Sequence, residues 1–430
     1  TEIYTLSLHD ALPISGGRSA AQRDRLQQKS GQIFDRKGIH EMTPRQVGDR
    51  MRSADLTLNL GAPALLSIIG LTGAAPQRAT GLANMWQMGQ RPTDNEGTKK
   101  RDITERGFFP ALERDALDPD SRPIYGALNI GRATMGAASQ GYGGIFFRMK
   151  SEVKQRCTFT GDDTFNVTMC SVKTANLQQF TDGLDTMIGK LSPSARNKFA
   201  ENNGELRQKL IDFFTAQRNG APFTVYKLPE RIQDVLFGGG AWDEDVTQND
   251  YSMLANFAET TFRDADVTRE RVVGFDDIES LLPTLGEARL DHLMTAVTHP
   301  RFSDVNIGNY IEAQIHGSVR FSDDVAALCL SQEDLQDAAR ALVKSRHPED
   351  ESYRPSTAEI KDASQEIIAK LKDFSRQSGV ALELYDTRGM VRTTDRAALA
   401  AERFSETHRD IFAAAKNYAE NTRTTEGSFR

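Results

Sequence analysis

Within the segment 309–317, polar side chains alternate with apolar ones from Tyr310 to His316. Because side chains alternate between the two faces of a β-strand, the sequence predicts that these polar groups share one face and the apolar residues the other. Unpaired polar groups are costly in a core, so such a row indicates a cleft in which chemistry takes place. The polar members are Tyr310, Glu312, Gln314 and His316.

Glu312 is the leading candidate for a catalytic group in this segment. A carboxylate that faces a cleft can stabilise an oxocarbenium cation, as carboxylates do in glycoside hydrolysis. The alternative is a surface glutamate on an edge strand, which is the commoner case for glutamate in general. The flanking isoleucines and the aligned polar groups favour the catalytic interpretation. Gln314 is expected to act as an amide clamp or to pair with a neighbouring strand, and His316 to have a supporting role.

Two earlier segments add complementary chemistry. Arg122 precedes a proline, which favours extended backbone, and an arginine at the start of a strand suits bidentate contact with a phosphate or a ribose hydroxyl. A surface arginine at a strand start is an equally good interpretation. Thr158 and Thr160 flank Phe159, so both hydroxyls are expected on one face, although threonine is also common in strands for its β propensity. Asp162 and the aspartate after it are compatible with a simple turn.

The residues above need a sheet to position them, and the sequence predicts strands in several places. The expected strands are 55–60, 124–130, 145–149, 155–160, 165–172, 223–228, 309–317 and 318–321, from their alternation and β-prone composition. The expected helical stretches are 176–191, 193–218, most of 250–290, 331–345, 357–378 and 395–420. Ser192 is expected to cap a helix, and Ser331 and Ser356 to begin capping boxes.

The loop 131–144 contains five glycines and lacks both the Gly-Lys-Ser/Thr ending of a P-loop and the spacing of a Rossmann fingerprint. Tyr142 in this loop is a candidate to stack on a planar ring, although loop tyrosines usually cover a core.

The chain is expected to divide into four parts. Residues 1–15 match the translation of a common short-read sequencing adapter, so we interpret them as an artefact and exclude them from the fold. Residues 16–120 are expected to be a mostly helical region. Residues 121–330 are expected to form the core, with a helical insertion at about 174–295, and residues 331–430 a helical C-terminal region.

Composition limits the classes of function. The chain has 430 residues and a formal net charge of −7, which argues against a nucleic-acid phosphate binder. It has no run of about 18 apolar residues, so no membrane-spanning helix is expected. The three cysteines lack metal-binding spacing, and the histidines do not cluster with them, so we expect reduced thiols and no metal.

Taken in order, Arg122, the Thr158–Thr160 segment and Glu312 resemble the Arg/Ser-Thr-Ser/Glu triad of bacterial mono-ADP-ribosyltransferases. The segments around them, within 120–170 and 305–330, look similar to a bacterial domain family first catalogued as of unknown function. That family resembles effectors that ADP-ribosylate a threonine of ubiquitin. The resemblance implies an α+β fold with an ADP-ribosyltransferase-like core of two small packed β-sheets. It also implies a bacterial protein that is secreted or delivered into a host or target cell.

The same resemblance implies a mechanism with NAD⁺ as co-substrate and no metal. Arg122 would hold a phosphate or the nicotinamide ribose, and the backbone near Tyr125 and Gly126 the nicotinamide amide. Thr158 or Thr160 would orient Glu312, which would bond the ribose 2′-hydroxyl and stabilise the oxocarbenium ion. The implied catalytic residues are Glu312, Arg122 and Thr160; the implied NAD⁺-binding residues are Arg122, Tyr125, Gly126, Thr158, Thr160, Tyr142 and Gln314.

Two departures from the family pattern bear on the acceptor. Ser-Thr-Ser is replaced by Thr-Phe-Thr, and the first acidic or amide residue of the Glu-x-Glu or Gln-x-Glu motif is Tyr310. Loss of that residue fits an acceptor other than arginine, and ubiquitin is the expected protein partner. Two alternatives stay open: an NAD⁺ glycohydrolase on the same fold, and a catalytically dead transferase that serves as a protein-binding module.

Overall fold

The structure is a computed structural model that describes most of the chain between residues 20 and 385. The described residues are 20–72, 80–91, 94, 96–109, 118–133, 135–137, 143–164, 168–224, 228–238, 244–298, 310–350 and 352–385. The segment 1–15, the expected helix 395–420 and Tyr142 lie outside them.

The chain forms two compact units. The first consists of Thr1–Lys99, Pro110–Asp162 and Val273–Arg430, and the second of Lys100–Phe109 and Asp163–Val272. The second unit therefore overlaps the expected insertion at 174–295 but begins and ends earlier. The difference arises because the residues after Val272 pack into the core of the first unit.

An eight-stranded mixed sheet is the centre of the first unit, with the strand order β12-β11-β4-β1-β3-β9-β5-β8. Its strands are β1 (Asp55–Leu60), β3 (Ile124–Asn129), β4 (Ile145–Met149), β5 (Cys157–Thr160), β8 (Val272–Gly274), β9 (Ile311–Ile315), β11 (Val325–Leu330) and β12 (Ala381–Leu384). β11 and β12 run parallel, whereas β1 with β3 and β4, β9 with β3 and β5, and β4 with β11 are antiparallel.

The two faces of this sheet differ in chemistry. The apolar face carries residues such as Leu56, Leu128, Phe147, Ile311 and Ile315, all of them buried in one hydrophobic core. Helices and 3₁₀ segments of the first unit contribute to the same core and so cover this face. The opposite face carries the alternate positions of the same strands, and these are largely polar.

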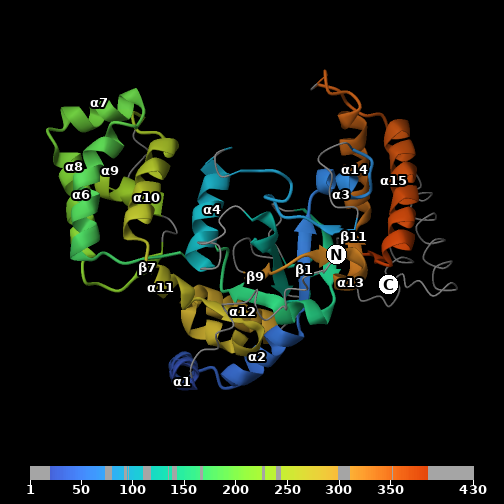
Figure 1. Cartoon of the computed structure of the whole chain (residues 1–430), viewed down its shortest axis with the longest axis horizontal. Helices are drawn as coiled ribbons and strands as arrows, with labels where there is room; N and C mark the ends of the chain where they lie inside the picture. Colours follow the sequence, from blue (N-terminus) through green and yellow to red (C-terminus); the bar gives the residue numbers. More distant parts are fainter. Residues whose placement is uncertain are drawn as a thin grey trace, which may run out of the picture. The chain divides into compact units, whose positions relative to one another are not determined.

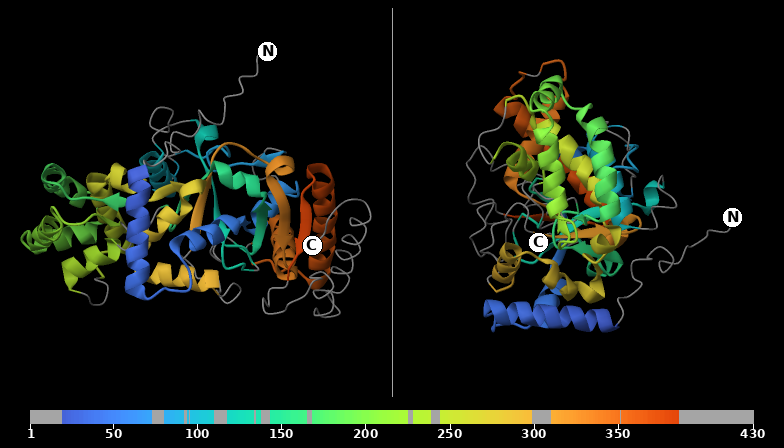
Figure 2. Two further views of the ribbon diagram at one scale, coloured as in Figure 1. Left: turned by 90° about the horizontal axis from the view of Figure 1, so that it is seen from below. Right: turned by 90° about the vertical axis from the view of Figure 1, so that its left-hand side faces the viewer.

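The remaining elements of the first unit surround the sheet. They are α1 (Ala20–Lys37), α2 (Pro44–Ser53), α3 (Ala62–Ile68), η2 (Pro119–Ser121), η4 (Ser151–Arg156), η5 (Phe275–Thr284), α12 (Glu287–Thr298), α13 (Phe321–Asp324), α14 (Gln332–Ser345) and α15 (Thr357–Ser378), with a small pair of strands β2 (Gly81–Leu82) and β10 (Val319–Arg320). α14 and α15 lie side by side (Figure 1). Figure 2 shows α1 in dark blue, and it packs against α2 and η5.

The second unit is mostly helical around its own hydrophobic core. Its elements are β6 (Met169–Cys170), α6 (Thr174–Ile188), α7 (Pro193–Glu201), α8 (Glu205–Ala216), β7 (Phe223–Thr224), α9 (Leu228–Phe237), α10 (Gln248–Phe262) and α11 (Ala265–Arg269), and most of α4 (Glu96–Phe108) belongs to it. α6, α8, α9 and α10 pack on one another in Figure 1. Phe180, Phe214 and Phe262 form an aromatic cluster at their centre, with ring centroids 4.8–5.0 Å apart.

The α+β class is confirmed, but the sheets differ from the expectation. Instead of two small packed sheets, the core strands join in one sheet of eight. β8, β11 and β12 were not predicted, and β12 interrupts the C-terminal region expected to be helical. The expected strand 223–228 is wrong at its end, because Leu228 begins α9. β12 exists because it pairs with β11, a long-range contact that outweighs local preference.

Several local expectations are confirmed. Ser192 caps α7 by accepting a hydrogen bond from the backbone of Ala195. Ser331 and Ser356 form the capping boxes that begin α14 and α15. None of the helices that the structure describes is both long enough and apolar enough to span a bilayer.

Candidate functional site

Three neighbouring strands bring most of the predicted residues together. β9 lies between β3 and β5. Across the β9–β5 pair, Thr160 faces Glu312 and Thr158 faces Gln314. On the other side of β9, Tyr125 of β3 also faces Gln314. Residues that face each other across a ladder share one side of the sheet, so the hydroxyls, the amide and the carboxylate lie together.

We call five residues of this face the polar row: Thr158, Thr160, Glu312, Gln314 and His316. Gln314 is its centre. The side-chain nitrogen of Gln314 donates to Glu312 Oε1 over 3.0 Å and to Thr160 Oγ1 over 3.1 Å. Its side-chain oxygen accepts from Thr158 Oγ1 over 3.0 Å. The amide therefore serves both as a clamp and as a bridge to the neighbouring strand.

The hydrogen-bond pattern of the polar row determines which group donates and which accepts in each bond. The single hydroxyl hydrogen of Thr158 goes to Gln314, so Thr158 Oγ1 accepts from Nε2 of His316, 2.9 Å away. His316 is then the tautomer with its proton on Nε2. The hydroxyl of Thr160 donates to the carbonyl of Asp162 over 2.7 Å, which leaves its oxygen to accept from Gln314. His316 thus donates to Thr158, Thr158 donates to Gln314, and Gln314 donates to the carboxylate of Glu312.

His316 is neutral at physiological pH. Burial, together with the nearby Arg156 cation, lowers its pKa to about 4. A neutral imidazole with its proton on Nε2 is compatible with the hydrogen bond that Nε2 donates to Thr158. This supports the secondary role expected for His316: it orients Thr158 and carries no charge near the carboxylate.

The polar row is buried. Glu312 is 4% exposed, and its neighbours Thr160 and Gln314 are fully buried. A cavity of about 330 Å³ lies elsewhere on the same sheet, and none of the row's residues lines it. The carboxylate of Glu312 is thus almost fully shielded from solvent in this structure.

Arg122 lies just before β3, with its side chain also buried. Its guanidinium group lies over the ring of Trp86, 4.2 Å from the ring centre, a cation–π arrangement. Its backbone carbonyl accepts from Nδ2 of Asn84 over 2.9 Å, and the same nitrogen donates to the carbonyl of Pro119 over 2.8 Å. The hydrogen bonds from Asn84 fix the backbone just before β3. The contact with Arg122 brings Trp86 next to a predicted site residue, which the sequence did not indicate.

The predicted NAD⁺-binding residues of β3 take different positions. Tyr125 is half-buried on the polar face, across from Gln314. Gly126 faces the other side, where a Cβ atom would come within 2.8 Å of the backbone oxygen of Thr57 on β1. The glycine therefore allows the close approach of two strands. Tyr142 lies outside the described residues.

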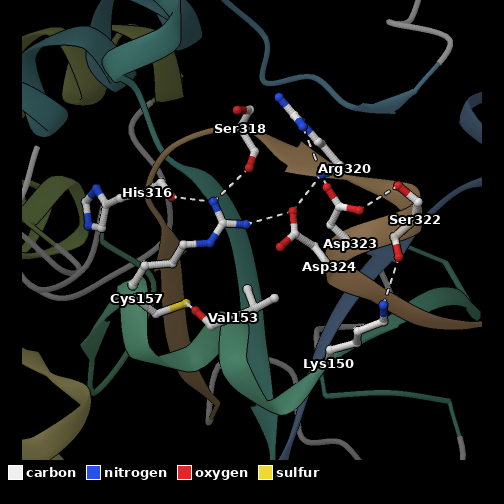
Figure 3. A network of polar contacts seen from close by, with 10 residues as sticks. Lys150, Val153, Cys157, His316, Ser318, Arg320, Ser322, Asp323 and Asp324 are labelled. Atoms are coloured by element: carbon white, nitrogen blue, oxygen red, sulfur yellow. Dashed lines mark hydrogen bonds and ion pairs between the residues drawn. The ribbon is translucent and has the colours of Figure 1, made fainter. Parts of the chain in front are cut away.

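Arg156 anchors the chain that follows β9, and the sequence did not single it out. Its Nη1 donates to the carbonyls of His316 and Ser318, at 3.0 and 2.7 Å, and its Nη2 lies 2.9 Å from Asp324 Oδ2 (Figure 3). The amide of His316 donates back to the carbonyl of Arg156 over 3.2 Å. One side chain thus fixes the backbone at His316, whose ring contacts Thr158. Its place directly before the Cys-Thr-Phe-Thr strand is the only local signal for this role.

A second anchor lies at the other end of β5. Arg289 of α12 forms an ion pair with the buried carboxylate of Asp162 and donates from Nη1 to the carbonyl of Gly161 over 3.0 Å. Asp162 therefore has a charged partner in addition to its place in a turn. The contact fixes the carbonyl of Asp162 that receives the hydroxyl of Thr160.

The arrangement offers one oriented carboxylate, two hydroxyls and an amide on a rigid support. Such a group can stabilise a developing cation or hold a sugar hydroxyl. Among the residues that the structure describes, no group of three His, Cys, Asp or Glu side chains is placed to hold a metal ion.

Comparison with known proteins gives one family match. Residues 87–226 match a family described as "Protein of unknown function (DUF3626)". The matched range includes Arg122, Thr158 and Thr160 and ends before Glu312. No curated protein matches the chain.

Proposed function

We propose that this chain is a mono-ADP-ribosyltransferase that transfers ADP-ribose from NAD⁺ to a side chain of another protein. One observation carries the proposal. Arg122, the two threonines and Glu312 are far apart in sequence, yet they lie on or next to the adjacent strands β3, β5 and β9. That is the grouping which the resemblance to the transferase triad requires.

Glu312 would stabilise the transition state of the glycosyl transfer. The bond between C1′ of the ribose and the nicotinamide nitrogen breaks, and its electron pair leaves with neutral nicotinamide. The carboxylate accepts a hydrogen bond from the ribose 2′-hydroxyl and faces the cationic sugar that results. The acceptor oxygen then forms the new bond to C1′ and loses its proton to solvent.

The other residues would prepare that carboxylate and its ligand. Gln314 is the group in direct contact with Glu312, so the threonine hydroxyls orient the carboxylate through this amide. Arg122 would hold a phosphate or the nicotinamide ribose. Because Arg122 and Glu312 are both buried, binding of NAD⁺ requires the residues that cover them, including Trp86, to shift.

The proposed acceptor is a threonine hydroxyl, with ubiquitin as the protein to test first. The support is the resemblance of the sequence to ubiquitin-modifying effectors, together with Tyr310, which replaces the acidic or amide residue of the family pattern and so fits an acceptor other than arginine. A protein with this activity would act on a host or target cell after secretion or delivery.

Incubation with biotin-labelled NAD⁺ and ubiquitin tests the proposal. We expect biotin on ubiquitin, and mass spectrometry is expected to place ADP-ribose on a threonine. Nicotinamide release with no labelled protein would assign the site to NAD⁺ hydrolysis instead. Binding of NAD⁺ with neither product would leave a binding module, and absence of binding would remove the NAD⁺ assignment altogether.

A further inference from the structure

A second feature of the polar face is a cavity of about 330 Å³ that the proposed transferase chemistry does not use. Its lining comes from α2, α12, the end of β3 and the turn after it, and from the strands β1, β4, β11 and β12. The residues with charged side chains in this lining are Arg50, Asp55, Arg132, Arg148 and Glu383.

The inner part of the cavity holds an ion pair between the half-buried Arg148 and the buried Glu383. Arg148 of β4 donates from Nη2 to Glu383 Oε1 of β12 over 2.5 Å, and Glu383 is only 4% exposed. The thiol of Cys329 lies 3.5 Å from the second oxygen of the same carboxylate. Glu383 thus occupies one side of the guanidinium group, and the polar floor is rigid because each of these strands is paired in the sheet.

The outer part of the cavity carries two exposed arginines, Arg50 and Arg132. Neither forms an ion pair with another residue of the described chain. Arg132 has a φ of 52°, a left-handed conformation that costs a non-glycine residue about 1 kcal/mol. The side chain of Asn129 fixes this turn through two hydrogen bonds to the backbone of Ala133. Its Nδ2 donates to the carbonyl of Ala133, and its Oδ1 accepts from the amide of Ala133.

The cavity and the polar row occupy different parts of the sheet. The row belongs to β5 and β9, whereas the cavity lies over β1, β4, β11 and β12 and reaches Asn129 at the end of β3, the strand next to β9. The segment 135–137 crosses β1 between them, because Ala137 donates from its amide to Thr57 Oγ1 and Asn59 donates to the carbonyl of Met135. A ligand in the cavity would therefore not contact Glu312.

The charge of the lining selects the ligand. Three arginines and two carboxylates line the cavity, so the lining carries a net charge of +1, and Glu383 is already paired with Arg148. The guanidinium groups of Arg50 and Arg132 outnumber the remaining carboxylate of Asp55 and suit an anion with several acceptor oxygens. The volume of about 330 Å³ is at the lower end of the range for small-molecule sites.

We propose that this cavity binds the phosphate group of a small molecule, with Arg50 and Arg132 as its ligands at the mouth. The strained backbone of Arg132 is kept because it positions the guanidinium group beside the cavity.

Titration calorimetry on the full chain tests this, with inorganic phosphate, ribose 5-phosphate and uncharged ribose as probes. We expect one molar equivalent of each phosphate to bind and ribose not to bind. Tighter binding of ribose 5-phosphate identifies a phosphorylated metabolite as the natural source, and equal affinity identifies free phosphate. No binding of either phosphate at millimolar concentration would overturn the proposal.

Arg132→Gly separates binding from folding. Glycine relieves the left-handed strain, so the melting temperature should not fall, while phosphate affinity drops at least tenfold. Arg50→Gln should weaken binding similarly. Arg45→Gln is the matched control, because Arg45 is exposed on the same helix as Arg50 and does not line the cavity.

Saturating NAD⁺ should change the phosphate affinity of the wild-type protein by less than about twofold. Wild-type affinity in Arg132→Gly, equal weakening in Arg45→Gln, or competition by NAD⁺ would each contradict a separate phosphate site.

Discussion

The side-chain amide of Gln314 donates a hydrogen bond to the carboxylate of Glu312, two residues earlier on the same strand, over 3.0 Å. Both side chains point to the polar face of β9, and both are buried. The carboxylate is thereby held in one orientation before any ligand binds, which is the condition for electrostatic stabilisation without reorganisation.

Replacement of Gln314 tests this positioning role. Gln314→Leu keeps the approximate size but removes the donors to Glu312 and Thr160 and the acceptor for Thr158. Buried groups left without partners should lower the free energy of unfolding by about 2 kcal/mol, measured by urea denaturation. We also expect NAD⁺ turnover to fall about tenfold. Gln208→Leu, on the exposed face of α8, should change stability by less than about 0.5 kcal/mol. Equal effects of the two variants would contradict the role of Gln314.

The pH dependence of stability should report His316. Its pKa is lowered to about 4 in the folded protein by burial and by Arg156, whereas an unfolded histidine titrates near 6.5. Between these two values the unfolded chain binds a proton that the folded chain does not. The free energy of unfolding should therefore fall as the pH falls through this window, by about 3 kcal/mol in total.

His316→Gln removes this group and should flatten the dependence between pH 6.5 and 4, measured by urea denaturation at several pH values. His40→Gln, which replaces an exposed histidine, should keep the wild-type slope. An unchanged slope in His316→Gln would show that other groups cause the acid sensitivity.

The anchor formed by Arg156 should contribute substantially to stability. Arg156→Met leaves two carbonyls and the carboxylate of Asp324 without this donor, and both members of the ion pair are mostly buried. Loss of one partner should cost about 3 kcal/mol by chemical denaturation. Arg320→Met is the control, because its pair with Asp323 is exposed and 3.7 Å long (Figure 3). That variant should cost less than about 1 kcal/mol, so a similar loss in both would contradict the role of Arg156.

Gly126 should resist substitution for a purely steric reason. In Gly126→Ala the new methyl group would lie 2.8 Å from the backbone oxygen of Thr57, so β1 and β3 would have to separate. We expect a loss of about 2 kcal/mol in the free energy of unfolding. Gly274→Ala provides the comparison, since a Cβ there meets nothing within 4 Å. A melting temperature for Gly126→Ala as high as that for Gly274→Ala would show that the strands adjust freely.

The sequence predicted those parts of the fold that depend on local pattern. Alternation along 309–317 placed Glu312, Gln314 and His316 on one face, and short-range motifs identified the caps at Ser331 and Ser356. β12 could not be predicted, because it depends on pairing with β11, whose partner residues lie 54 positions earlier.

The same limit applies to the site. The hydrogen bonds of Gln314 to both threonines depend on the register between β5 and β9, which is set by contacts across more than 150 residues. The partnership of Arg122 with Trp86 and the anchoring by Arg156 are long-range or three-dimensional in the same sense. The residue types of Arg122, Trp86 and Arg156 do not by themselves indicate which residues they contact in the fold.

Transfer of labelled ADP-ribose by Glu312→Gln is the most direct test of the proposed function. The substitution keeps the size of the side chain and removes the negative charge that would face the cationic sugar. We predict a folded protein whose turnover is at least about a hundredfold below wild type, with Glu259→Gln, an equally buried carboxylate of the second unit, as the control for loss of folded protein. Transfer at the wild-type rate by folded Glu312→Gln would contradict the account.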